Sequence, residues 1–285
     1  TCFKHGDVLY LRRTVKQRKP FMTSMEQMKQ KAKAVWSDFA LMENFTGMAA
    51  PRLVKFADIN ANDTVLDVAC GTGVVALTAA RCGASVTGAD LTPELIKRAK
   101  ENSKIFELDV DFHECDVECL PFKNASFDVV VSQFGHMFAP RPSVALSEMM
   151  RVLKPKGTIA FSTWPSELFM GSFFQIIGNY GPPLPEGAEP PVLWGNVDTV
   201  KQRLSSHADN IVFDRYRYIM PGLSVQHIRH NFETGAGPLK RMIEKLSDEP
   251  AKLDALRSEI DSSISHYFED NYLRMDYLMT KGQKK

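Results

Sequence analysis

Three acidic residues and two glycines are the residues of this chain whose types and spacing could do chemistry. Asp67 lies inside the apolar run VLDV, Gly71 and Gly73 end that run, and VVALTAAR follows. A strand, a glycine turn and a helix in this order bring free backbone N–H groups and the positive end of a helix to one spot. Because a buried carboxylate is costly unless it is paired, we expect Asp67 to face a cationic group of a ligand.

Two further acids follow the next predicted strands. Asp90 ends the run SVTGA, and Asp116 comes just after DFHE. In an open α/β sheet, ligands bind beyond the carboxyl ends of the strands. There Asp90 could accept from both hydroxyls of a ribose, and Asp116 from the amino group of an adenine. Taken singly, Asp67 could be a turn acid, Asp90 an N-cap of the helix that Pro93 opens, and Asp116 a loop acid.

The glycine turn separates two kinds of ligand. A dinucleotide site requires GxGxxG, whereas residues 71–76 read GTGVVA, with alanine in place of the third glycine. Asp67 would face the pyrophosphate of a dinucleotide, but it would suit a ligand with an ammonium and no phosphate. S-adenosylmethionine carries an ammonium, a carboxylate, a ribose and an adenine, and it is the predicted cofactor.

The elements that must position these residues alternate between strands and helices. The predicted strands are 64–69, 85–89, 111–114, 127–132 and 158–163, with helices at about 74–82, 93–102 and 143–153. Strands joined through helices imply a parallel sheet with right-handed crossovers. The near-continuous apolar strands are typical of a sheet buried on both faces.

The flanking segments differ in character. Residues 1–23 are basic and lack a continuous apolar stretch, which predicts a disordered tail rather than a secretory signal. Residues 24–57 are predicted to be helical, and 165–195, rich in Pro, Gly and aromatic residues, to be a lid or substrate-facing loop. The remaining predicted helices are 197–206, 224–232, 238–246 and 249–268, and the remaining strands are 210–220 and 272–280.

Five blocks occur in order along the chain: VLDVACGTG, GADLTPELI, HECDVECLPF, FDVVVSQFGHMFAP and LSEMMRVLKPKGTIAFSTW. Together they resemble class I S-adenosylmethionine-dependent methyltransferases, and among these the small-molecule branch that includes the quinone-biosynthesis C-methyltransferases. The resemblance covers about residues 30–165. It implies an α/β, Rossmann-like, seven-stranded, mostly parallel sheet of order 3-2-1-4-5-7-6, with an N-terminal helical cap and a helical insertion before the last strand.

The resemblance also divides the chain. It implies a single methyltransferase domain over 24–285, with a helical lid at 24–57, a cofactor-binding core at 58–164, and acceptor-site insertions with the last two strands at 165–285. Within the core, Asp67 and the 69–73 backbone would hold the methionine part of the cofactor, Asp90 the ribose, and Asp116 and Val117 the adenine.

These roles lead to a list of candidate site residues. The predicted cofactor contacts are Asp67, Ala69, Cys70, Gly71, Gly73, Asp90, Leu91, Asp116, Val117, Ser132 and Gln133. The predicted lid or acceptor pocket is Trp36, Phe39, Phe134, Met137, Trp164 and Phe173, with Phe169, Phe174, Tyr180, Trp194 and Phe232 as further aromatic candidates. Each aromatic residue could equally belong to the core, and Cys70 is expected to pack rather than to react.

His136 is the predicted catalytic residue. It follows the fourth strand, where donor and acceptor meet in this family, and histidine titrates near neutrality. It could instead bind the cofactor or shape the pocket. Methyl transfer from a sulfonium is an in-line displacement that mostly requires alignment of the two reactants. The predicted reaction is transfer to a small, apolar or aromatic metabolite, and no residue is assigned to a metal.

Composition narrows the function classes. A net charge of +1 argues against an overall basic nucleic-acid binder, and SQFG after the fourth strand differs from the Asn/Asp-Pro-Pro-aromatic block of base-flipping methylases. The five cysteines form no CxxC pair, and no apolar run reaches the ~18 residues that cross a bilayer. A cytoplasmic protein is therefore expected.

Two other functions stay open. One is a nucleotide-dependent oxidoreductase with a degenerate glycine loop, and the other is a non-catalytic protein that binds S-adenosylmethionine. The sequence determines neither the acceptor nor the atom methylated, and it is compatible with a homodimer.

Overall fold

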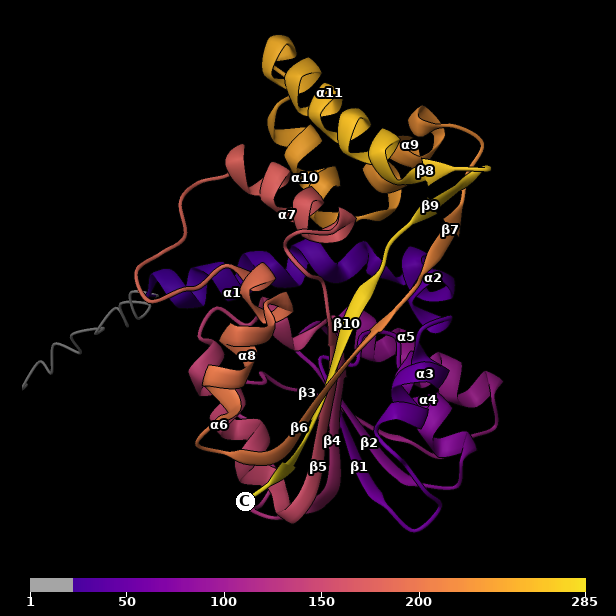
Figure 1. Ribbon diagram of the computed structural model, residues 1–285, viewed down its shortest axis with the longest axis vertical. Helices are drawn as coiled ribbons and strands as arrows, with labels where there is room; N and C mark the ends of the chain where they lie inside the picture. The colour runs from indigo at the N-terminus through magenta and orange to yellow at the C-terminus, as the bar shows by residue number, and fades with distance from the viewer. Residues whose placement is uncertain (1–22) are drawn as a thin grey trace, which may run out of the picture.

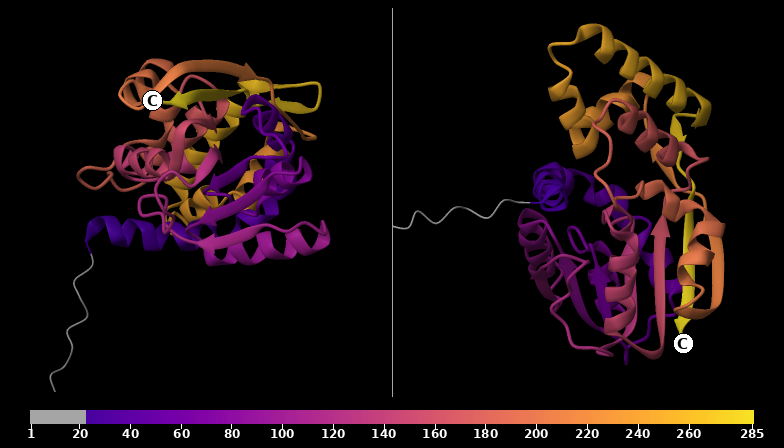
Figure 2. Two further views of the ribbon diagram at one scale, coloured as in Figure 1. Left: turned by 90° about the horizontal axis from the view of Figure 1, so that it is seen from below. Right: turned by 90° about the vertical axis from the view of Figure 1, so that its left-hand side faces the viewer.

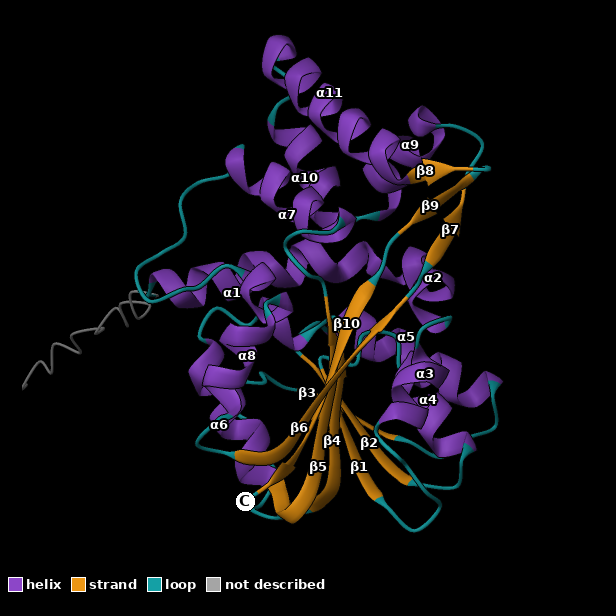
Figure 3. Cartoon of the chain, in the orientation of Figure 1, coloured by secondary structure: helices purple, strands orange, loops and turns teal. Residues whose placement is uncertain are grey.

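The computed structural model describes residues 23–285 and has a seven-stranded sheet at its centre (Figures 1 and 3). The strand order is β3-β2-β1-β4-β5-β10-β6. Neighbouring strands from β3 to β5 pair in parallel, and β10 pairs antiparallel with both β5 and β6. Because β10 is the last strand of this sheet along the chain, the predicted order 3-2-1-4-5-7-6 is confirmed.

The parallel part of the sheet agrees closely with the sequence prediction. Its strands are β1 (Thr64–Val68), β2 (Ser85–Asp90), β3 (Asp111–Glu114), β4 (Phe127–Gln133) and β5 (Leu153–Thr163). The helices between them are α4 (Val74–Arg81), α5 (Pro93–Ile105) and α6 (Pro142–Val152). Alternate residues of β4 enter different apolar clusters, Val129 and Val131 on the side of α3, α4 and α5, and Val130 on the side of α6 and α8. The sheet is therefore buried on both faces.

The start of β5 departs from the prediction. The predicted strand starts at residue 158, yet β5 begins at Leu153, which pairs with Phe127. The register shifts between Phe127 and Val129, and Lys156 has a φ of 65°. The Pro-Lys-Gly segment is thus an irregularity within a strand, because its neighbours on both sides pair with β4.

The two predicted C-terminal strands are each divided. Residues 210–220 contain β6 (Ala208–Tyr216) and β7 (Ile219–Pro221), and residues 272–280 contain β9 (Tyr272–Arg274) and β10 (Tyr277–Lys284). A second, three-stranded sheet joins β7, β9 and β8 (Phe268–Glu269) in antiparallel pairs. This ribbon connects the main sheet to the helices above it (Figure 1).

The N-terminal segment is helical but interrupted. It consists of α1 (Ser24–Trp36), the 3₁₀ helix η1 (Ser37–Met42), α2 (Glu43–Gly47) and α3 (Ala50–Phe56). Thr23 caps α1. The Thr23 N–H donates to Glu26 Oε2 over 2.7 Å, and the Glu26 N–H donates to Thr23 Oγ1 over 3.2 Å. Apart from Thr23, the tail predicted for residues 1–23 lies outside the described residues.

A cap of helices stands beyond the carboxyl ends of the parallel strands, and α1 lies between this cap and the sheet (Figures 1 and 2). The cap contains α7 (Phe169–Asn179), α9 (Val225–Gly235), α10 (Gly237–Lys245) and α11 (Pro250–Tyr267). α8 (Val197–Leu204) packs beside β6. Between residues 23 and 285, no helix combines the length and apolar character needed to cross a bilayer.

The prediction of a loop over 165–195 is wrong for two of its parts. Residues 169–179 form α7, and Pro191–Gly195 form the 3₁₀ helix η3. Burial of Phe169 and Phe173 stabilises α7 despite its glycines, since burying an aromatic side chain outweighs the ~1 kcal/mol helix propensity deficit of a glycine.

Candidate cofactor and acceptor site

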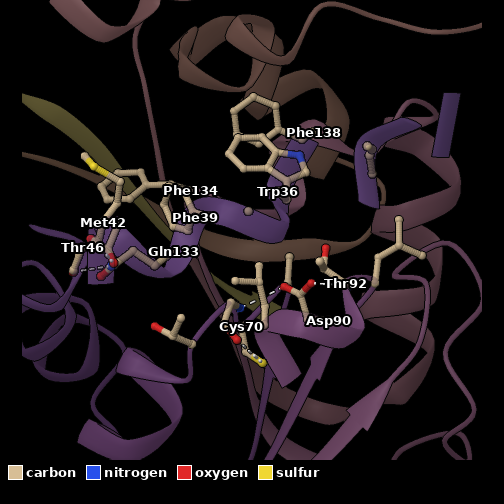
Figure 4. Close-up of a pocket in the computed structure, with 18 of the residues that line it drawn as sticks. Trp36, Phe39, Met42, Thr46, Cys70, Asp90, Thr92, Gln133, Phe134 and Phe138 are labelled. Atoms are coloured by element: carbon tan, nitrogen blue, oxygen red, sulfur yellow. Dashed lines mark hydrogen bonds between the residues drawn. The ribbon is translucent and has the colours of Figure 1, made fainter. Parts of the chain in front are cut away.

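A cleft opens where the carboxyl ends of β1, β2 and β4 meet α1 and the cap (Figure 4). It encloses about 1500 Å³, counting its open mouth. Its lining comes from the turns after β1, β2 and β4, from α1, and from α7 and α9 of the cap.

The turn after β1 forms the floor of one half of the cleft. Ala69, Gly71 and Gly73 have φ values of 52°, 56° and 83°. The Cys70 N–H donates to Ala89 O over 3.0 Å, which ties the turn to β2. Ala69 holds a left-handed conformation without being glycine, an uncommon state that persists where the surroundings impose it. Burial raises the pKa of the Cys70 thiol well above its ordinary range, so this side chain packs in protonated form.

Asp67 is the most deeply buried acid of the cleft, with a relative exposure of 1%. Its Oδ2 accepts from the N–H of Ala76, in the first part of α4, over 3.0 Å, whereas Oδ1 has no hydrogen-bond partner within the described part of the chain. Burial raises the pKa of this carboxyl to about 8. A ligand ammonium would give Oδ1 a partner and favour the charged form. The orphaned oxygen thus fits the amino group of S-adenosylmethionine.

Asp90 is fixed by two backbone donors. Its Oδ1 accepts from Thr92 N over 2.8 Å and its Oδ2 from Gly71 N over 2.9 Å. Burial raises the pKa of this carboxyl as well. Each oxygen keeps acceptor capacity toward the cleft, which suits two neighbouring hydroxyls. The N-cap residue of α5 is Thr92, so Asp90 is not the simple N-cap that the sequence alone left open.

Asp116 is joined to the N-terminal helix. Its Oδ1 accepts from Glu118 N over 2.9 Å, and its Oδ2 lies 2.5 Å from Lys29 Nζ. Lys29 also pairs with Glu118, whose side chain is 1% exposed and accepts from Arg141 Nε over 2.8 Å. Lys29 lines the cleft and was not predicted. Its signal was present in the sequence, because Lys29 and Lys33 are one helical turn apart and face the alternating acids Glu114, Asp116 and Glu118.

The other half of the cleft is apolar and aromatic. Phe134 stacks on Trp164 with ring centroids 3.9 Å apart, and Trp36 contacts Phe138 at 4.7 Å. The predicted residues that line the cleft on this side are Trp36, Phe39, Phe134, Trp164 and Phe173, together with Phe174 and Phe232. Residues that the sequence did not single out also line it, namely Met42, Phe45, Thr46, Phe138, Met170 and Pro238. Phe169, Tyr180 and Trp194 lie outside the lining.

Among the predicted cofactor contacts, the structure places Asp67, Ala69, Cys70, Gly71, Asp90, Leu91, Asp116, Val117 and Gln133 in the lining. Gly73 and Ser132 do not line the cleft. A Cβ on Gly73 would come within 2.9 Å of the Phe112 ring. Ser132 Oγ donates to Val68 O over 2.8 Å and accepts from His136 N over 3.1 Å, so it fixes the end of β4 from within the core.

The position of His136 corrects its predicted role. Its side chain is fully buried, with ring centroids 4.6 Å from Phe161 and 4.7 Å from Trp194, and it does not line the cleft. Neither ring nitrogen has a hydrogen-bond partner among the described residues, and burial lowers the pKa of the imidazole to about 3. The 3₁₀ turn at 136–138 directs His136 and Met137 into the core. Because its side chain is buried outside the described lining of the cleft, we do not retain His136 as a catalytic base.

The Lys29 contacts predict how fast the cofactor exchanges. Met28, Lys29 and Trp36 of α1 line the cleft, so a shift of α1 would widen the end of the cleft at Asp116. We expect Lys29→Met to speed dissociation of S-adenosylhomocysteine by about fivefold, corresponding to loss of about 1 kcal/mol of ion pairing. Stopped-flow tryptophan fluorescence would measure the rate, since Trp36 and Trp164 both line the cleft. Arg141 remains to pair with Glu118 in this variant.

Lys31→Met is the matched control, because Lys31 is exposed on the same helix. It should leave the dissociation rate unchanged. Added salt should speed release from the unmodified protein and have a smaller effect on Lys29→Met. Equal rates for Lys29→Met and the unmodified protein at low salt would contradict this role of α1.

Comparisons with known proteins agree with this geometry. Residues 66–161 match the family model described as a methyltransferase domain. An uncharacterised protein of Mycobacterium tuberculosis is 34% identical over 246 residues, which cover 86% of this chain and 90% of that protein. A demethylmenaquinone methyltransferase of Thermus thermophilus is 36% identical over 116 residues, which cover 40% of this chain and 53% of that protein.

The fold has solved counterparts as well. Phosphoethanolamine N-methyltransferase 2 of Haemonchus contortus, in complex with S-adenosyl-L-methionine, matches with a TM-score of 0.56 at 17% identity. The match covers 92% of this chain and 60% of that chain. At this identity the likeness concerns the fold. With the family match, the strand order and the relatives taken together, the chain belongs to the class I S-adenosylmethionine-dependent methyltransferases.

Proposed function

We propose that this protein transfers the methyl group of S-adenosylmethionine to a small apolar or aromatic metabolite. The observation that carries the proposal is one cleft with two unlike halves. One half presents the buried carboxylates of Asp67 and Asp90, and the other is walled by aromatic side chains such as Phe134, Trp164 and Phe173. A polar cofactor and an apolar acceptor would each find matching surroundings.

Each part of the cofactor has a candidate partner. Asp67 Oδ1 would accept from the ammonium, Asp90 from the ribose hydroxyls, and Asp116 from the adenine amino group, with Val117 beside the ring. When bound, S-adenosylmethionine supplies an electrophilic methyl group on a sulfonium. The aromatic half would hold the acceptor in line with that group and exclude water, and such orientation can contribute ~7–11 kcal/mol.

The positions of the titratable side chains support the assignment of one half of the cleft to the cofactor and of the other half to the acceptor. Among the described lining residues they are Lys29, Asp67, Cys70, Asp90, Cys115 and Asp116, and all belong to the cofactor half. In the aromatic half, the described side chains offer orientation and desolvation rather than proton transfer. An acceptor that is nucleophilic as bound therefore suits this cleft.

The experiment has a binding arm and a turnover arm. Titration calorimetry should detect binding of S-adenosylmethionine and S-adenosylhomocysteine, with NADH as the comparison ligand. Incubation with methyl-labelled donor and a metabolite extract should then label an apolar product. Binding of NADH alone would favour the oxidoreductase alternative. Binding of the donor without labelling in a broad acceptor screen would favour a non-catalytic protein.

The relatives support the acceptor class but do not define it. One relative is named as a demethylmenaquinone methyltransferase, which is consistent with an apolar ring as the acceptor. A cytoplasmic location, a homodimer and a single domain over 24–285 stay predictions from the sequence.

A further inference from the structure

We infer that Gln133 positions the acceptor by accepting a hydrogen bond from a hydroxyl or N–H group next to the atom that is methylated. The inference rests on the proposed function and adds a chemical requirement to it. The acceptor would be an apolar or aromatic compound that carries a hydrogen-bond donor, rather than a purely hydrocarbon one.

The orientation of the Gln133 amide is fixed. Gln133 is the last residue of β4, and its Nε2 donates to Thr46 O, in α2, over 2.7 Å. The hydroxyl of Thr46 donates to the backbone just before it, to Met42 O, the N-cap residue of α2, and to Glu43 O, each over 3.3 Å. Because a flipped amide would point its oxygen at a carbonyl oxygen, Nε2 must face Thr46. Gln133 Oε1 is therefore the atom left for another partner.

Gln133 Oε1 has no hydrogen-bond partner among residues 23–285. The atom is buried and unbonded, although the residue lines the cleft. Leaving a buried carbonyl oxygen unpaired costs about 1–3 kcal/mol. A ligand donor would remove that cost, whereas a hydrocarbon ligand would leave it in place. Because Gln133 Oε1 can only accept a hydrogen bond, the site favours a ligand that carries a donor group.

The surroundings assign this oxygen to the acceptor rather than to the cofactor. Figure 4 shows Gln133 beside Thr46, Met42, Phe39 and Phe134, across the cleft from Asp90 and Thr92. Among the described residues that line the aromatic half, Gln133 and Thr46 alone carry a side-chain oxygen, and the Thr46 hydroxyl is already bonded. The ammonium of the cofactor has a charged and stronger partner in Asp67 Oδ1.

The described lining of the aromatic half carries no titratable side chain, and the Gln133 amide is consistent with this. Gln133 does not exchange protons near neutral pH, so it can orient a hydroxyl or N–H without removing its proton. It is a positioning residue and not a base. The hydrogen bond would turn a lone pair of the acceptor, or the ring carbon beside it, toward the methyl group.

The test compares two probes that differ in their donor. Phenol and toluene have similar shape, and only phenol can donate to Oε1. Their affinities would be measured by ligand-observed NMR on protein saturated with S-adenosylhomocysteine. Comparing the phenol-to-toluene affinity ratio between variants cancels the difference in hydrophobicity of the two probes. For Gln133→Met, we expect this ratio to fall about tenfold, equivalent to one hydrogen bond of ~1.4 kcal/mol.

Controls separate this role from others. Gln202→Met removes the same amide from an exposed position of α8 outside the cleft lining, so the ratio should stay within about twofold of its original value. S-adenosylhomocysteine affinity should also stay within about twofold in Gln133→Met. An unchanged probe ratio in Gln133→Met would overturn the inference. A large loss of S-adenosylhomocysteine affinity with an unchanged ratio would assign Gln133 to the cofactor instead.

A second measurement does not depend on the variant folding. In the unmodified protein, the carbon shift of the Gln133 side-chain carbonyl should move with phenol and not with toluene. Equal shifts with both probes would contradict the inference. Failure of the proposed function would appear separately, as no binding of S-adenosylhomocysteine to the unmodified protein.

Discussion

Replacing Asp67 by asparagine is expected to weaken S-adenosylmethionine binding at least about 30-fold and yet stabilise the ligand-free protein near pH 8. The loss follows from removing the charged partner of a buried ammonium, which costs at least ~2 kcal/mol. The gain follows from the burial that raises the pKa of Asp67 from 3.8 to about 8. The amide of asparagine keeps an oxygen that can accept from Ala76 N and has no charge to desolvate.

The sign of the pH effect follows from the direction of the shift. The folded protein holds the Asp67 proton more tightly than the unfolded chain does. The contribution of Asp67 to stability is therefore full below about pH 4 and is lost as the pH rises through about 8. Asparagine does not titrate, so the melting temperature of the variant should exceed that of the unmodified protein by a growing margin over this range.

Calorimetry in buffers of different ionisation enthalpy supplies a second readout. Near pH 7 the ligand-free Asp67 is mostly protonated, and pairing with an ammonium should release its proton. The unmodified protein should release close to one proton per bound cofactor, and Asp67→Asn markedly less. Equal affinities for the two proteins would rule out Asp67 as the ammonium partner.

Asp128→Asn is the matched control for this substitution. Asp128 pairs with Lys154 over 2.9 Å, away from the cleft lining, and the hydrogen bond from Lys154 lowers the pKa of its carboxyl to about 2. Its contribution to stability is present above about pH 4 and is lost as the pH falls toward 2. Asp128→Asn should lower stability slightly at neutral pH and leave cofactor affinity unchanged, the reverse of Asp67→Asn.

Gly135→Ala is expected to lower cofactor affinity at least about tenfold and the melting temperature by about 5 °C. A Cβ at this position would lie 2.5 Å from Ala69 Cβ and 2.6 Å from Ala69 O. Since both contacts are too short, the segment after β4 must move away from the turn after β1. Such overpacking costs about 1–3 kcal/mol, and each kcal/mol lowers Tm by a few degrees in a chain of this size.

The displaced turn contains Ala69, Cys70 and Gly71, which line the cofactor half of the cleft. Calorimetry and thermal melting would measure the two effects. Gly178→Ala in α7 is the control, because a Cβ there meets nothing within 4 Å, and alanine favours a helix. It should keep the affinity and hold or raise Tm. Normal affinity in Gly135→Ala would mean that the turn tolerates the displacement.

The sequence predicted best what depends on local pattern. Asp67, Asp90 and Asp116 follow or lie within strands whose apolar runs are plain, and parallel strands bring their carboxyl ends together. His136 was misplaced for a physical reason. The side chain of a histidine just after a strand can point into the cleft or into the core. For His136 the direction depends on the 3₁₀ turn and on Phe161 and Trp194, which lie far along the chain.

The contribution of the cap could not be predicted in the same way. Burial of Phe169 overrides the loop-like composition around it, and only the tertiary packing of α7 on α11 reveals this. Lys29 could be recognised from its spacing with Lys33, but only after the acids beyond β3 were placed opposite α1. The free oxygen of Gln133 follows from a contact with a backbone carbonyl in another helix, for which the sequence carries no signal.

The placement of β10 has a consequence for how the chain reaches this structure. β10 inserts between β5 and β6, where Leu278 pairs with Thr163 and Tyr277 with Tyr216. The whole cap lies between Thr163 and Leu278 along the chain, and pairings of such separation slow folding. Until β10 arrives, β5 and β6 expose unpaired edges that can recruit other chains. Refolding should therefore be slow and prone to aggregation, with the cap and the end of the sheet completed in one late step.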